Sequence, residues 1–184
     1  MTADLASGKR YAITGSSGSG KSTLLSILAG QLIPSTGAIE NDTELTIGWV
    51  FQNPTGSPRR TAIDHVVLPM LARGMRRTEA QLKAMRLLYR FGLMPQARSE
   101  FRVLSGGQGQ RLMLARAVAH APGLLLVDEP TAQLDQHSAT TVNEALRQTS
   151  LDGGIVVIAT HDQRTADQCD EQIALTAQGR HASP

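Results

Sequence analysis

Apolar residues occur along the chain either in short continuous runs or at helical spacing, and the two kinds of segment alternate. The continuous runs predict strands at residues 11–14, 47–51, 124–127, 155–159 and 173–175. Helical spacing predicts helices at 21–32, 61–91, 106–119, 138–149 and 163–169, with Pro69 and Gly74 interrupting the second of them. Within that second stretch, Leu82, Met85, Leu88 and Tyr89 show the clearest helical spacing.

Strands that alternate with helices predict an α/β fold in which helices cover both faces of a mostly parallel sheet. The apolar run at 124–127 is typical of a strand that is buried on both faces of such a sheet. A chain of 184 residues predicts one domain, 1–184, that forms a core without disulfides or metal. The helical stretch at about 61–104 is expected to be a subdomain inserted into this domain.

Composition narrows the classes of function. Aromatic residues make up only 3 % of the chain and the formal net charge is +2, so neither indicates a nucleic-acid partner. Cys169 is the only cysteine, which excludes an internal disulfide, and we expect it half-buried on a late helix. Residues 1–8 lack a signal-peptide core, and the longest apolar runs, about seven residues, are far shorter than a membrane span. We therefore expect a soluble protein that reaches a membrane only through a partner.

A phosphate-binding P-loop pattern is complete in one glycine-rich turn between a predicted strand and a predicted helix. Its residues are Gly15, Ser16, Ser17, Gly18, Ser19, Gly20, Lys21 and Ser22. The glycines let backbone N–H groups close around a polyphosphate, and the helix start adds its positive dipole. Lys21 would reach the β- and γ-phosphates, Ser22 would bind Mg²⁺, and Thr23 would bond the α-phosphate. The alternative, a flexible Gly/Ser linker, is disfavoured by the flanking strand and helix.

Two carboxylates follow the apolar run at 124–127. Because open α/β sheets bind ligands at the carboxyl ends of their strands, Asp128 would hold Mg²⁺ through water, and Glu129 would act as general base on the attacking water. Solvated acids at a strand end would explain this pair if it stood alone. The P-loop upstream favours the catalytic interpretation.

A second anion-binding cradle is predicted where Ser105 caps a helix that opens with Gly106, Gly107 and Gln108. An ordinary capped turn is the alternative. A single active site has no use for two cradles, whereas two chains arranged head to tail would each lend this one to the partner's γ-phosphate.

The order of these motifs resembles the ATP-binding cassette (ABC) ATPases, over about residues 11–179. The resemblance implies ATP and Mg²⁺ as cofactors, a head-to-tail dimer, and a position at the cytoplasmic face of the membrane on a permease. It further implies that Gln52 senses Mg²⁺ and the γ-phosphate, that Asp135 links the paired sites, and that His161 is the switch histidine at a strand end.

The sequence departs from the family pattern at two places. In the family, an antiparallel strand well upstream of the P-loop usually carries an aromatic residue that stacks on adenine. Only 14 residues precede the P-loop here, so we expect that strand to be largely absent. The antiparallel sub-sheet should therefore be trimmed, and recognition of the base weakened. Tyr11 lies too close to the P-loop to stack on adenine. Gly109 stands where the family commonly has a polar residue.

Three classes of function compete. A P-loop kinase or GTPase has no use for residues 104–108, and a soluble ABC-type ATPase acting on DNA or the ribosome usually has two cassettes or a long insertion. The remaining class, a transporter ATPase driving a permease, is the one we expect. Residues 61–73 resemble the branch that serves lipoprotein release, macrolide and haem efflux and cell-division permeases, and the loop at 53–60 would dock the permease.

Overall fold

The computed structural model describes residues 2–40, 45–132 and 134–176. Within these ranges, five parallel strands form one sheet in the order β2-β3-β4-β1-β5. They are β1 (Arg10–Thr14), β2 (Ile47–Val50), β3 (Leu124–Asp128), β4 (Ile155–Thr160) and β5 (Glu171–Ala174). The α/β class and the parallel sheet are therefore confirmed.

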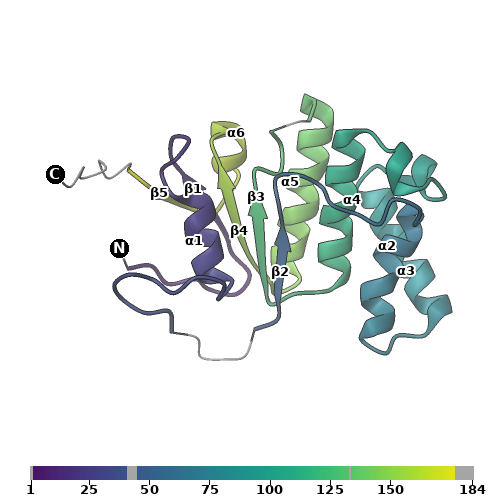
Figure 1. Cartoon of the computed structure of the whole chain (residues 1–184), viewed down its shortest axis with the longest axis horizontal. Coiled ribbons are helices and arrows are strands. Elements are labelled where there is room, and N and C mark those ends of the chain that lie inside the picture. Colours follow the sequence, from purple (N-terminus) through teal and green to yellow (C-terminus); the bar gives the residue numbers. More distant parts are fainter. Residues whose placement is uncertain (1, 41–44, 133, 177–184) are drawn as a thin grey trace.

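In the described part of the chain, six α-helices and two short 3₁₀ helices accompany the sheet. They are α1 (Lys21–Leu28), α2 (Ala62–Ala72), α3 (Arg77–Arg90), η1 (Met94–Gln96), η2 (Phe101–Val103), α4 (Gly106–Ala119), α5 (Gln136–Leu151) and α6 (Gln163–Ala166). Helix α1 lies on the opposite side of the strands from α5, and α2 and α3 stand apart beyond α4 (Figure 1).

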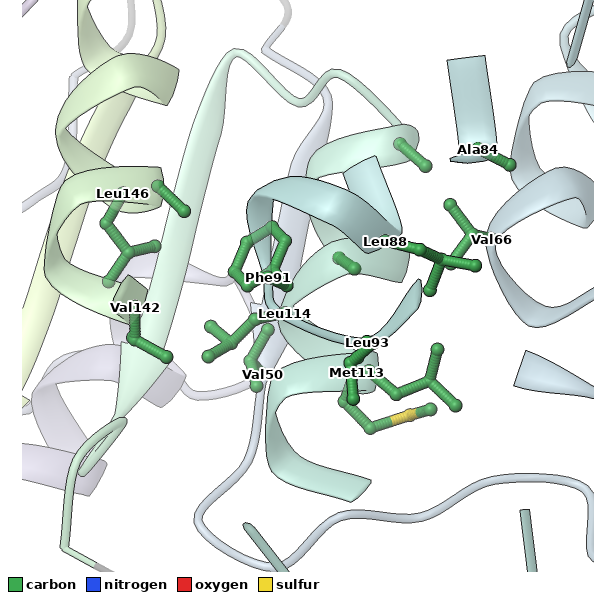
Figure 2. Close-up of a cluster of buried hydrophobic side chains, with 14 of the residues drawn as sticks. Val50, Val66, Ala84, Leu88, Phe91, Leu93, Met113, Leu114, Val142 and Leu146 are labelled. Carbon is green, nitrogen blue, oxygen red and sulfur yellow. The ribbon is translucent and has the colours of Figure 1, made fainter. Parts of the chain in front are cut away.

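Buried side chains form two cores, one on each face of the sheet. Alternation along β3 sends Leu125 and Val127 into one core and Leu124 and Leu126 into the other. The first core continues through α4 and α5 into α2 and α3, where Phe91 and Leu114 lie between the sheet and the helical stretch (Figure 2). The second core is covered by α1, whose Leu25 is fully buried. Because the first core is continuous, the helical stretch at 61–104 is packed onto the sheet domain rather than separate from it.

Several predicted boundaries differ from the structure. The helix predicted at 21–32 ends at Leu28, because Gly30 adopts a left-handed backbone with φ +70°. The stretch predicted at 61–91 is two helices that separate at Gly74 (φ +83°), whereas Pro69 remains inside α2. The helix predicted at 163–169 ends at Ala166.

Two further expectations are refined. Of the residues at helical spacing in α3, only Leu88 is buried, because the helix packs inward through Ala80, Ala84 and Leu88. The antiparallel sub-sheet is trimmed further than predicted: in the described ranges the only antiparallel pairing is one bridge, Thr61 to Glu100. None of the described helices is both long and apolar enough to cross a membrane.

Candidate nucleotide-binding and catalytic site

The register of the sheet brings the predicted site residues to one edge. Thr14 pairs with Thr160, Asp128 with Ala159, and Val50 with Val127, so β1, β2, β3 and β4 end at nearly the same level. The segments that leave this edge carry Gly15, Gln52, Glu129 and His161. Parallel pairing thus places four motifs that are far apart in the sequence beside one another.

The loop between β1 and α1 has the backbone that a phosphate cradle needs. Gly18 and Gly20 adopt left-handed φ values of +79° and +96°, which only glycine adopts readily. A Cβ atom at Gly15 would lie 2.5 Å from Ser19 Oγ and 2.6 Å from the Leu175 carbonyl oxygen, so no side chain fits there. The first N–H groups of α1, from Lys21 onward, have no acceptor within the helix and are free to bind an anion.

Lys21 places a positive charge inside this loop. Its side chain is 8 % exposed, and Nζ donates hydrogen bonds to the carbonyl oxygens of Gly15 (2.8 Å) and Ser16 (3.3 Å). Nζ also lies 3.9 Å from Glu129 Oε1. Two loop carbonyls and one carboxylate position this buried ammonium group. A phosphate can replace the neutral carbonyl oxygens as its hydrogen-bond acceptor, because hydrogen bonds between charged groups are stronger.

Ser22 and Asp128 meet beside the cradle although 106 positions separate them. Ser22 Oγ donates a hydrogen bond of 2.7 Å to Asp128 Oδ2, and Asp128 is 9 % exposed. A hydroxyl and a carboxylate are the hard oxygen ligands that Mg²⁺ prefers. Ser19 Oγ is buried in the same loop and has no hydrogen-bond partner among the described residues. An orphaned hydroxyl and this oxygen pair fit a polyphosphate with its metal ion.

Glu129 is held in an unusual position at the end of β3. It adopts φ +49°, and its N–H donates to the Ala159 carbonyl oxygen at 2.8 Å. Its side chain is only 10 % exposed, and Oε1 lies 2.8 Å from His161 Nδ1. Non-glycine residues with positive φ cost energy and concentrate at functional sites. The strain aims the Glu129 carboxylate along the sheet edge, between Lys21 and His161.

The contact between Glu129 and His161 was not predicted from the sequence. His161 follows β4 directly, and its backbone N–H donates a hydrogen bond to Glu129 Oε2 at 3.4 Å. The His161 side chain is 65 % exposed. A donor N–H on Nδ1 would orient the carboxylate and leave the other ring nitrogen to face outward. The only signal in the sequence was that each residue follows an apolar run, and that these two runs are consecutive along the chain.

Three predicted groups lie outside this cluster. Gln52 is exposed two residues after β2, and no described hydrogen bond joins it to Asp128 or Glu129. Ser105 caps α4 as predicted, in a capping box with Gln108, but α4 lies across the sheet from α1 (Figure 1). Asp135 caps α5, where bonds from the Ser138 N–H (3.0 Å) and hydroxyl (2.8 Å) lower the pKa of its carboxyl group. Within one chain, the second cradle does not reach the P-loop.

The segment after Gln52 is tied to α4 through contacts that sequence reasoning missed. Gln110 is 3 % exposed and its Nε2 donates to the Phe51 carbonyl oxygen at 3.3 Å. Gly109 is buried, and a Cβ atom there would come within 3.3 Å of Pro54 Cγ. Tyr11 is 1 % exposed within β1, so it does not present a face for stacking.

A parallel sheet whose first strand enters this loop defines the class of a P-loop nucleotide-binding protein. Comparison with known proteins narrows the class. The family described as "ABC transporter" matches residues 1–132. A Mycobacterium tuberculosis protein described as an uncharacterized ABC transporter ATP-binding protein, Rv0073, is 38 % identical over an alignment of 191 positions, and the match covers 96 % of this chain. The chain spans only 58 % of that relative's length.

Two further similarities agree. The lipoprotein-releasing system ATP-binding protein LolD of Legionella pneumophila is 37 % identical over an alignment of 184 positions, and the match covers 91 % of this chain and 81 % of LolD. The dimeric post-hydrolysis structure of the ATP-binding cassette MJ0796, bound to ADP and Pi, has a TM-score of 0.83 at 32 % identity, covering 95 % of this chain and 84 % of that one. This chain belongs to the ABC transporter family. The resemblance inferred from its motifs is confirmed.

Proposed function

We propose that the chain is an ATP-binding and ATP-hydrolysing subunit that drives a separate membrane permease. The observation that carries this proposal is the Glu129 carboxylate, buried between the P-loop lysine and His161 at the carboxyl edge of the sheet. A strained, shielded carboxylate beside a phosphate cradle is suited to accept a proton from an attacking water. ABC family membership and the fold support the same assignment.

Each side chain of the site has a role in that reaction. The loop from Gly15 to Thr23 would bind the phosphates, with Lys21 Nζ exchanging its carbonyl partners for the β- and γ-phosphate oxygens. Ser22 and, through water, Asp128 would hold Mg²⁺, with Gln52 as a further ligand. The metal ion would neutralise charge on the transferred phosphoryl group. Glu129 would orient and deprotonate the water, and His161 would hold Glu129 in position.

The second cradle requires a second chain. The N-terminus of α4, with Ser105, Gly106, Gly107 and Gln108, would bind the γ-phosphate of a partner copy in a head-to-tail dimer, and Asp135 would lie between the paired sites. The separation of α4 from α1 within one chain supports this arrangement, as does the dimeric structure of the bacterial ABC transporter cassette MJ0796.

The permease would dock on the loop at 53–60 and hold the chain at the cytoplasmic face of the membrane. The likeness to LolD, together with residues 61–73, supports an efflux or extrusion system such as one for lipoprotein, haem, a drug or a peptide. A soluble ABC-type ATPase acting on DNA or the ribosome is the alternative, and no nucleic acid is expected as partner. Stimulation of ATP turnover by the co-purified permease, rather than by DNA or ribosomes, distinguishes the two.

The decisive variant is Glu129→Gln, which keeps the shape of the side chain and removes its basicity. We expect unchanged ATP binding, a trapped closed dimer and turnover lower by about 10² or more. Glu171→Gln is the matched control, because this glutamate is exposed and, among the described residues, pairs with Lys9 alone (2.6 Å). Near-normal steady-state hydrolysis by Glu129→Gln would remove this residue from the role of general base.

A further inference from the structure

Helix α3 carries large apolar side chains on the face that points away from the protein. Leu82, Met85 and Tyr89 are 63 %, 43 % and 78 % exposed. Their spacing of three and four residues places them in one row along the helix. The opposite face, with Ala80, Ala84 and Leu88, already fills the core. The row therefore lies outside the core and leaves a line of apolar surface open to a partner.

Positive charge surrounds this row. Arg86 lies within it, one helical turn from both Leu82 and Tyr89, and Arg90 follows Tyr89 directly. Neither arginine takes part in a salt bridge with any described residue. The one acidic residue of α3, Glu79, is already paired with Lys83 at 3.0 Å. The outer face of α3 is therefore apolar along its centre and cationic at its side.

The charge extends beyond α3. Residues 57–120 contain twelve Lys and Arg against three Asp and Glu, a net charge of +9, although the whole chain carries only +2. The remaining residues are correspondingly acidic. This part of the molecule would therefore be drawn toward a negatively charged surface, while the rest would be repelled by it.

The shape of the row favours a lipid surface over a protein groove. The two hollows near this region are lined by residues 57–60, 64 and 77, and by residues from β2, its following loop, α2 and α4. Leu82, Met85 and Tyr89 line neither of these two hollows, so the row lies on the open surface of α3 beside them. Leucine, methionine and tyrosine flanked by arginine are typical of helices that lie at the boundary of headgroups and acyl chains. Nucleic acid would use the charge but leave the apolar row without a purpose.

We propose that the outer face of α3, formed by Leu82, Met85, Arg86, Tyr89 and Arg90, binds the surface of an anionic lipid bilayer. The arginines would contact lipid phosphates while the apolar row enters the headgroup region. The inference relies on the proposed function only for bringing the chain close to a membrane. Such a contact would fix the orientation of the helical stretch relative to the bilayer and assist the permease in holding the subunit.

Vesicle co-sedimentation of the full chain, without ATP and without permease, tests the proposal. We expect binding to phosphatidylcholine vesicles that contain phosphatidylglycerol as the minor component, and much weaker binding to phosphatidylcholine alone. The pair Arg86→Gln with Arg90→Gln should lower the affinity at least about fivefold, since each basic residue near an anionic surface contributes roughly that factor. Leu82→Ala with Tyr89→Ala should lower it by a similar factor, because burial of apolar surface also contributes.

Ile33→Ala with Lys9→Gln is the matched control, since both residues are exposed and lie outside the basic segment. The control pair should bind as the unaltered chain does, and all pairs should keep basal ATP turnover. Equal binding to neutral and anionic vesicles, or α3 variants that bind like the control, would overturn the proposal. Variants that keep vesicle binding but lose stimulation by permease in detergent would assign the face to a protein and overturn it as well. Failure of ATP hydrolysis would leave the vesicle result untouched, so the two proposals fail separately.

Discussion

The contact between Gly56 and Phe101 gives a prediction whose sign can be worked out from distances. A Cβ atom at Gly56 would lie 2.6, 2.8 and 2.8 Å from ring atoms of Phe101, well inside van der Waals contact. The ring cannot withdraw easily: the Phe101 N–H is bonded to the Arg60 carbonyl oxygen at 3.0 Å, and the ring packs on His65 at 5.5 Å. His65 in turn accepts the Ser57 N–H at 3.0 Å.

Gly56→Ala should therefore destabilise the protein. Overpacking of this kind costs about 1–3 kcal/mol. The alanine also restricts the unfolded chain, which offsets about 0.4–1 kcal/mol. We expect a net loss of about 1–2 kcal/mol in the free energy of unfolding, measured by urea denaturation with circular dichroism.

A double-mutant cycle separates the ring contact from other causes. In a Phe101→Ala background the clash is gone and only the effect on the unfolded chain remains, so Gly56→Ala should stabilise by about 0.4–1 kcal/mol. The sign of the substitution thus reverses between the two backgrounds. Equal destabilisation in both would refute the reasoning, because the cause would then lie outside Phe101.

Three further predictions follow from the site and its supports. Ser105→Arg should spare ATP binding by the monomer and block ATP-driven dimerisation. Mixing Ser105→Arg chains with Lys21→Ala chains should restore ATP turnover at one composite site. Confirmed heterodimers without activity would contradict the sharing of sites between chains. ATP and GTP should bind within a few-fold of each other, a difference below about 1.4 kcal/mol, because phosphate contacts ignore the base; titration calorimetry with each nucleotide decides this, and a strong adenine preference would mean that some residue stacks on the base. Burial lowers the pKa of His65, so the unfolded chain takes up the proton first as the pH drops below about 6.5, and stability should fall by at most about 1.4 kcal/mol per pH unit. Urea unfolding at pH 7.5 and 5.5 should show a smaller pH effect on stability in His65→Gln than in the unaltered chain. An equal effect in both chains would exclude this histidine as the cause.

Local motifs were predictable because their geometry is set by neighbouring residues. A strand, two left-handed glycines and a helix start are enough to form the cradle around Lys21, and Ser105 needs only Gln108 to form its capping box. The pairing of Ser22 with Asp128 was predictable only because motif order implies it. The strand order was not, since nothing in the sequence of β2 indicates that it pairs with β3.

Which face of α3 is buried could not be predicted from apolar spacing. Leu82, Met85 and Tyr89 are more hydrophobic than Ala80 and Ala84, yet the alanines are fully buried. Small side chains let two helices approach closely. The face of α3 that is buried is therefore determined by close packing against α2 and α4, and not by hydrophobicity alone. The same limit applies to the contact between Glu129 and His161, which depends on the left-handed backbone at Glu129.

The departure at Gly109 has a physical explanation once the loop after β2 is considered. Helix α4 starts at the Ser105 cap, and its next turn touches Pro54 through Gly109 and bonds the Phe51 carbonyl oxygen through Gln110. A Cβ atom at Gly109 would lie 3.3 Å from Pro54 Cγ, so the proline ring would have to move by a few tenths of an ångström. Glycine at this position therefore sets the distance between the segment that carries Gln52 and the helix that begins at Ser105. Because close packing transmits displacement, we expect a movement of one of these segments to shift the other.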